Sequence, residues 1–181
     1  GTGVGGLGAI VNSGADITTA LGNVTLTGDT TFGGSGRWDI RGGAATLSTS
    51  GAAYNLTKVG TNQVSLVGVN VDGNLGDINV MNGILSIETT TSGLGNAGNT
   101  LTISSGATLQ IYNSTVALEK LFVLNGNGTA TTLNIGAGTG NNIIGQMTLN
   151  GACIFSAATG SALTLSGTLT GSGSLIKTGA G

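Results

Sequence analysis

Short runs of alternating apolar and polar residues, separated by glycine or by asparagine-glycine pairs, fill this chain from end to end. Runs such as Ala45–Thr49, Thr108–Tyr112 and Ser174–Lys177 place every second side chain on the same face of an extended strand. The residues between the runs, Asn150-Gly151 for example, tolerate the positive φ of a tight corner. The pattern predicts an all-β chain of many short strands, each with one buried face.

Composition separates this prediction from that of a disordered segment. With 36 glycines and 7% charged residues, the chain shares some features of low-complexity sequence. However, 39% of its residues are hydrophobic, and they alternate regularly instead of clustering at random. Aromatic residues make up only 3%, so the core is mainly aliphatic and suits a narrow interior filled in thin layers.

We predict a right-handed parallel β-helix, a solenoid, with an antiparallel β-sandwich as the runner-up. The strands are very short, and only residues 115–124 have an ambiguous helical spacing, so a sheet with crossover helices is disfavoured. Asparagine and small residues suit corners where side chains stack from coil to coil. Asparagine-glycine is also a strong hairpin signal, which keeps the sandwich open. At about 20 residues per coil, a spacing within the range of solenoid repeats, the chain would form roughly nine coils.

The alternation also predicts which side chains form the core of the solenoid. One leucine from each of nine runs is expected to face inward: Leu26, Leu56, Leu66, Leu85, Leu101, Leu109, Leu133, Leu149 and Leu165. The lone Cys153 is also interpreted as a small buried core residue, because the chain contains no histidine to activate a catalytic thiol.

Two phrases in the first part of the chain recur, in altered form, about 120 residues later. Thr25–Phe32 recurs as Thr148–Phe155, and Leu56–Gly60 recurs as Leu175–Gly179. Self-similarity of this kind is typical of stacked repeat proteins. We therefore interpret residues 1–181 as a single β-helical repeat segment of a longer protein, with an internal super-repeat near 120 residues.

The segment from Leu56 to Leu85 resembles the autotransporter-associated β-strand repeat. That family has a Leu-x-Lys-x-Gly opening, then Leu-x-Leu-x-Gly-x-Asn, and a Val-x-x-Gly-x-Leu ending. The matching positions are Leu56, Lys58, Gly60, Leu66, Gly68, Asn70, Val80, Gly83 and Leu85. Ser174–Gly181 resembles the opening of a further copy. The chain departs from the family at Gln63-Val64, where Gly-Thr-Leu is frequent, and at Val69, where alanine is common.

The resemblance implies a parallel β-helical stalk in a large secreted bacterial protein, outside the cell or on its outer surface. In that family the repeat mostly builds the shaft, and any activity lies elsewhere. We therefore expect a structural shaft or a fibre-forming segment. Its expected partners are neighbouring repeats of the same protein, or identical subunits stacked end to end.

The most polar stretch that also contains an aromatic residue is Arg37–Arg41. Alternation places Trp38 on one face, which we interpret as the core side, and Arg37, Asp39 and Arg41 on the other. These three charged residues are the candidate contact for a partner such as a surface glycan. An adhesin or glycan-binding module is therefore the alternative function.

Other functions find less support in the residues. We expect no enzyme activity, because the chain has no histidine and its seven acidic residues are scattered, although polysaccharide-active β-helices remain a competing class. No cofactor or metal is expected: the loop Asp72–Asp77 offers some oxygen ligands for calcium but is interpreted as solvated. Threonine-rich strands leave ice binding as a minor alternative.

Charge and hydropathy bear on two further partners. The net charge of −2, with its few basic residues scattered, predicts no nucleic-acid contact. No apolar run approaches the 18 residues or so that a membrane-spanning helix needs, so we expect no membrane span in this segment.

Overall fold

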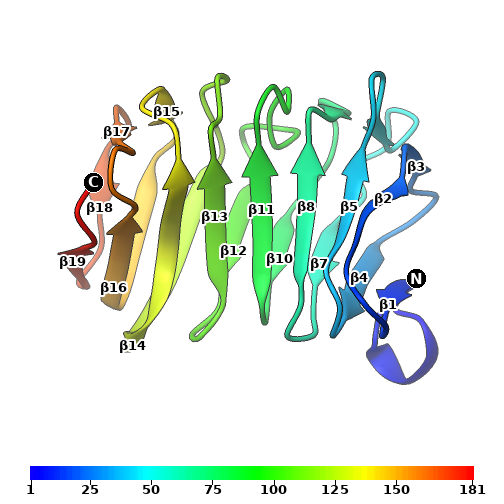
Figure 1. The fold of residues 1–181 in the computed structure, drawn as a ribbon, viewed down its shortest axis with the longest axis horizontal. Helices are drawn as coiled ribbons and strands as arrows, with labels where there is room; N and C mark the ends of the chain where they lie inside the picture. Colours follow the sequence, from blue (N-terminus) through cyan, green and yellow to red (C-terminus); the bar gives the residue numbers. More distant parts are fainter.

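The computed structural model describes residues 1–181 as a solenoid in which each strand pairs with the strand one turn away (Figure 1). Every one of these pairings is parallel, including the long contact between β14 (Leu121–Ala137) and β16 (Met147–Ala157). The predicted parallel β-helix is confirmed, and the antiparallel sandwich is excluded. The N- and C-termini lie at opposite ends of the stack.

Strands of successive turns form three faces. The first face contains β1 (Ile10–Asn12), β4 (Thr30–Gly34), β7 (Leu56–Lys58), β10 (Ile78–Val80), β12 (Thr100–Ile103), the first parts of β14 and β16, and β18 (Leu169–Thr170). The second contains β2 (Ile17–Leu21), β5 (Trp38–Arg41), β8 (Gln63–Val67), β11 (Ile84–Glu88), β13 (Thr108–Tyr112), the later parts of β14 and β16, and β19 (Ser174–Thr178). The third is made by β3 (Asn23–Thr25), β6 (Thr46–Ser48) and β9 (Asn70–Val71), and by β15 (Asn141–Ile143) with β17 (Leu163–Leu165).

The turns are longer than the sequence suggested. Paired positions lie between 19 and 26 residues apart, the extremes being Leu21 with Ile40 and Thr30 with Leu56. The chain therefore makes about seven turns, and the prediction of nine is wrong. The reason is that corner loops, such as residues 49–55 between β6 and β7, add length that the strand pattern does not reveal. At about 4.8 Å per turn the stack is about 34 Å long.

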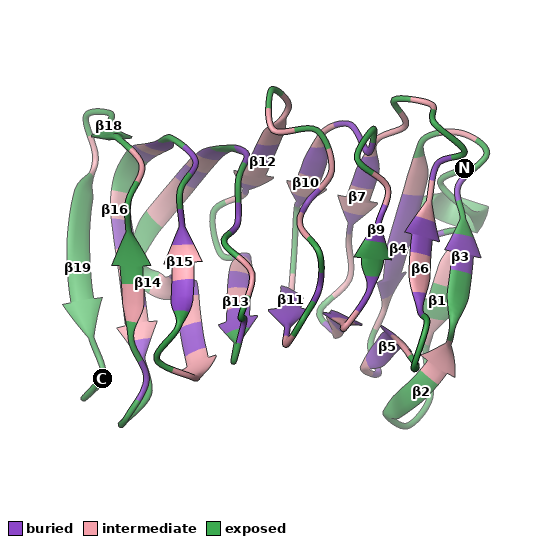
Figure 2. Cartoon of the chain, turned by 90° about the horizontal axis from the view of Figure 1, so that it is seen from above, coloured by how far each residue is buried: buried purple, intermediate pink, exposed green.

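The core is a column of apolar side chains enclosed by the three faces. Eight of the nine predicted leucines are at most 3% exposed, and Cys153 is fully buried. The exception is Leu165, which is 36% exposed because its strand, β17, lies at the C-terminal end and pairs only with β15. Figure 2 shows the same gradient, with the buried colour in the middle turns and the exposed colour dominating β19.

One corner is held by side chains that link each turn to the next. The backbone N–H of Asn55 donates to Asp29 Oδ1 (2.9 Å), and that of Asp77 donates to Asn55 Oδ1 (2.8 Å). One turn further on, Thr100 N–H donates to Asp77 Oδ1 (2.8 Å). At this corner, a short polar side chain of one turn thus accepts a hydrogen bond from a backbone N–H of the next turn, which strand pairing does not satisfy.

The repeated phrases and the ambiguous residues 115–124 can now be placed in the fold. Of the phrases spaced by about 120 residues, Leu56–Lys58 forms β7 on the first face, whereas Ser174–Thr178 forms β19 on the second. Residues 115–124 contain no helix: an isolated bridge joins Leu118 to Ile143, and the chain then enters β14. In the whole structure, no helix is long and apolar enough to cross a bilayer.

Candidate functional site

The three predicted site residues lie together on the outward side of the second face. Arg37 precedes β5, and Asp39 and Arg41 lie within it, while Trp38 and Ile40 point inward and are at most 1% exposed. The Trp38 indole N–H donates to the Gly33 carbonyl (3.0 Å), and its ring meets Phe32 edge to face at 5.0 Å between centroids. The core position predicted for Trp38 is confirmed.

Asp39 is the centre of an ion-pair network and is completely buried beneath two arginines. Arg37 donates from Nε to Asp39 Oδ1 (2.8 Å) and from Nη2 to Oδ2 (3.0 Å). Arg41 donates from Nη2 to Asp39 Oδ2 (2.8 Å). The hydrogen bond to Asp39 raises the pKa of Arg37 above its already high ordinary value. Only the two arginines therefore remain accessible to a partner, with side chains 27% and 37% exposed.

The network continues across successive turns of the same face. Glu88 Oε1 accepts hydrogen bonds from Arg37 Nη2 (3.3 Å), Gln63 Nε2 (3.4 Å) and Ser86 Oγ (2.9 Å). Further along, Gln110 Nε2 donates to Ser86 Oγ (3.1 Å), and its Oε1 accepts from Asn134 Nδ2 (2.9 Å). Polar side chains on this face thus form hydrogen bonds to partners one or two turns away.

Beside this network lies a groove of about 360 Å³, lined by Arg37, Arg41, Val67, Glu88, Thr89, Gln110 and Tyr112. Reasoning from the sequence did not single out Glu88, Gln110 and Tyr112. They take outward positions in their strands, as Asp39 and Arg41 do in β5, but their separation along the chain hides their proximity. Only the register, which pairs Arg41 with Val67, Val67 with Glu88 and Glu88 with Tyr112, brings them together.

Two lysines are buried in the solenoid, which the sequence reasoning did not foresee. Lys58 takes an inward position in β7, and its Nζ donates to the carbonyls of Val59 (2.7 Å), Gly60 (3.0 Å) and Asn82 (3.2 Å). Lys120 Nζ donates to carbonyls of two preceding turns, Asn96 (2.9 Å) and Leu75 (3.4 Å). Burial lowers the pKa of each lysine to about 8.

The two carboxylates of the Asp72–Asp77 loop have separate structural roles. Backbone N–H groups of Asn74, Thr49 and Gly51 donate to Asp72 and hold its pKa well below the ordinary value. Asp77 faces the next turn, and the Thr100 N–H lowers its pKa in the same way. No group of three or more histidine, cysteine, aspartate or glutamate side chains could hold a metal ion.

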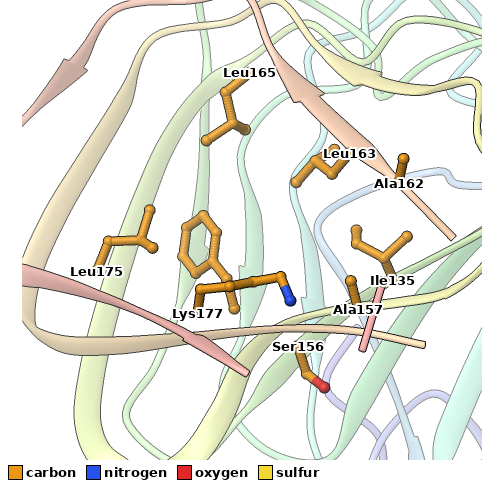
Figure 3. A pocket seen from close by; sticks show the side chains of 10 residues that line it. Ile135, Ser156, Ala157, Ala162, Leu163, Leu165, Leu175 and Lys177 are labelled. Atoms are coloured by element: carbon orange, nitrogen blue, oxygen red, sulfur yellow. The ribbon is translucent and has the colours of Figure 1, made fainter. Parts of the chain in front are cut away.

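A second cavity, also of about 360 Å³, opens at the C-terminal end of the core (Figure 3). Its lining is mostly apolar and comes from the last turns, with Leu163 and Leu165 on one side and Leu175 and Lys177 on another. Because the apolar column ends here, this cavity is the exposed cross-section of the core rather than a separate pocket in a face.

Comparisons with known proteins identify no relative. A scan against protein-family models, a search of curated proteins and a search of solved structures each find no match to this chain.

Proposed function

We propose that this chain is a shaft segment of a secreted bacterial cell-surface protein, stacked end to end with further turns of the same kind. The observation that carries the proposal is the character of the two end turns. At the C-terminal end Leu169, Leu175 and Ile176 are 46%, 40% and 38% exposed, and at the N-terminal end Ile17 is 47% exposed. Strand edges with apolar side chains favour pairing with another strand.

The lysine contacts support the same proposal. Lys177 Nζ donates to the carbonyls of Thr178 (2.8 Å) and Gly179 (2.9 Å), as Lys58 Nζ does to those of Val59 and Gly60. Lys58 has a third acceptor, Asn82 of the following turn. A turn stacked on β19 would supply the corresponding carbonyl to Lys177 and cover the apolar cavity beside it.

A rod of this kind suits a spacer, because each turn contacts only its neighbours and adds a fixed length. The proposal includes the absence of enzyme activity: the buried carboxylates Asp39 and Glu88 are engaged with arginine, glutamine and serine donors. A polysaccharide-active β-helix is the competing class. Release of reducing ends from a panel of bacterial and plant polysaccharides by the purified chain would favour it.

Immunogold labelling of intact producing cells, with antibodies against this chain, tests the proposed location and role. We expect gold particles outside the cell, at a distance from the outer surface, and loss of the signal after brief protease treatment of whole cells. Label found only inside permeabilised cells would refute the proposal.

Stacking between identical subunits can be measured separately, by sedimentation of the purified chain over a range of concentrations. We expect self-association that Ile176→Lys at the C-terminal end reduces. Met81→Lys is the matched control, because Met81 is 56% exposed but follows β10 in the middle of the stack. Equal effects of the two substitutions would argue against end-to-end contact.

A further inference from the structure

The groove on the second face combines features that ordinary surface packing does not require. Its floor is one outward row, Arg41, Val67, Glu88 and Tyr112, contributed by four consecutive turns. At about 4.8 Å per turn the row is roughly 14 Å long. The groove has a volume of about 360 Å³, which lies at the small end of the range for ligand sites.

Tyr112 supplies an exposed aromatic ring at one end of this row. The ring is placed by a β-bulge: Ile111 pairs with Ile135 and Tyr112 with Ala137, so Gly136 is the extra residue. A Cβ on Gly136 would lie 2.8 Å from Tyr112 Cδ2, which means that this position of the ring depends on glycine. Tyr112 remains 44% exposed, and bulges often orient a side chain beside a binding site.

Arg41 and Glu88 supply hydrogen-bonding groups that the protein itself uses only in part. Arg41 donates through Nη2 to Asp39, and its side chain remains 37% exposed, so the outer part of the guanidinium can donate to a ligand. All three hydrogen bonds to the Glu88 carboxylate go to Oε1, which leaves Oε2 as an acceptor. The groove therefore offers donors and an acceptor to a ligand.

Backbone strain occurs at the same place. Thr89, which lines the groove, has φ of 55°, a left-handed conformation that is unfavourable for a β-branched residue. Such strained residues concentrate at ligand sites, where the surrounding structure holds them in position.

From this combination we propose that the groove binds a neutral saccharide of one or two rings. A sugar hydroxyl both donates and accepts, so a pair of hydroxyls matches the Arg41 donors and the Glu88 acceptor. The C–H face of a pyranose ring can pack on Tyr112. Asp39 and Glu88 balance the charges of Arg37 and Arg41, which disfavours phosphate or an acidic sugar. The inference is independent of the proposed shaft.

A glycan array with neutral and acidic sugars, followed by calorimetry on the best neutral ligand, tests the proposal. We expect Tyr112→Ala to weaken binding about tenfold or more, and Arg41→Gln to weaken it as well. Gly136→Ala should also weaken it, although Gly136 does not line the groove, because the new methyl group displaces the Tyr112 ring. Asn79→Ala on the first face is the control and should bind as the wild type does.

Circular dichroism and thermal melting of each variant separate lost binding from lost folding. Two results would overturn the proposal: no neutral glycan bound at millimolar concentrations, or binding that Tyr112→Ala leaves unchanged in a folded variant. Preference for acidic glycans at this groove would also contradict it.

Discussion

At the scale of single residues, the buried cations are the least expected feature of this fold. Lys58 occupies a position that Phe32 and Val80 fill in the neighbouring turns, yet its ammonium group remains hydrogen-bonded because the chain bends back to present carbonyls. Lys120 satisfies carbonyls of two preceding turns. These side chains join consecutive turns through hydrogen bonds that are buried or partly buried.

Their lowered pKa predicts a stability that rises with pH. Folded lysines with a pKa of about 8 lose protons before unfolded ones, whose pKa is near 10.5. Between these values the unfolded chain binds more protons, so the free energy of unfolding should increase from pH 8 to pH 10. Urea titrations at several pH values measure this slope. The variant Lys58→Met should show a smaller slope, and an equal slope would contradict the assignment.

Asp39 provides a second test at this scale. Asp39→Asn keeps the shape of the side chain but removes the charge between Arg37 and Arg41, so we expect a loss of about 1–2 kcal/mol in the free energy of unfolding. The exposed Glu119, changed to glutamine, is the matched control and should cost less than about 0.5 kcal/mol. Chemical denaturation at neutral pH compares the two.

At the scale of strands and corners, the close approach of successive turns limits which residues fit. At the corner between the two parts of β14, Gly126 lies directly over the next turn: a Cβ there would be 2.1 Å from the Ala152 carbonyl oxygen. The two segments that meet here, in β14 and β16, are held in place by strand pairing, with Gly126 opposite Gly151 and Leu124 opposite Leu149. Neither can move away without breaking hydrogen bonds.

We therefore expect Gly126→Ala to destabilise the fold by about 1–3 kcal/mol through overpacking. Gly73→Ala is the control, since a Cβ at Gly73 meets nothing within 4 Å and its φ is not in the left-handed range. Thermal unfolding of the two variants should separate them. Equal melting temperatures would mean that the turns can spread apart at this corner.

At the scale of the whole molecule, the stack is quasi-one-dimensional. A middle turn is covered on both sides, whereas an end turn is covered on one, so stability should be greatest in the centre. Burial already follows this order: Leu109 is fully buried and Leu165 is 36% exposed.

Aspartate substitutions at these two leucines test the gradient. Leu109→Asp buries an unpaired charge in a central turn and should cost more than about 3 kcal/mol, enough to unfold a marginally stable chain. Leu165→Asp should be much milder, because the new carboxylate can reach water. Hydrogen exchange followed by mass spectrometry should also show the slowest exchange in β8, β11 and β13. Uniform protection from end to end would contradict this description.

Much of the architecture could be predicted because it depends on local patterns. Alternation placed Trp38 on the opposite face from Arg37 and Arg41, and it identified most of the core leucines, since side chains of a strand point to opposite faces in turn. The number of turns could not be obtained in this way. It depends on loop lengths at the corners, and loops carry no periodic signal.

The sequence by itself determined the all-β character and the inward or outward direction of most strand residues, and it favoured a parallel stack over an antiparallel sandwich. Only the tertiary structure decided which residues of different turns meet, because register depends on corner lengths that vary from turn to turn. It also decided that Lys58 is buried, although its chemistry favours water, because nearby backbone carbonyls replace its hydration. The groove over Arg41, Glu88 and Tyr112 has the same origin: three residues far apart in the chain become neighbours when the turns stack.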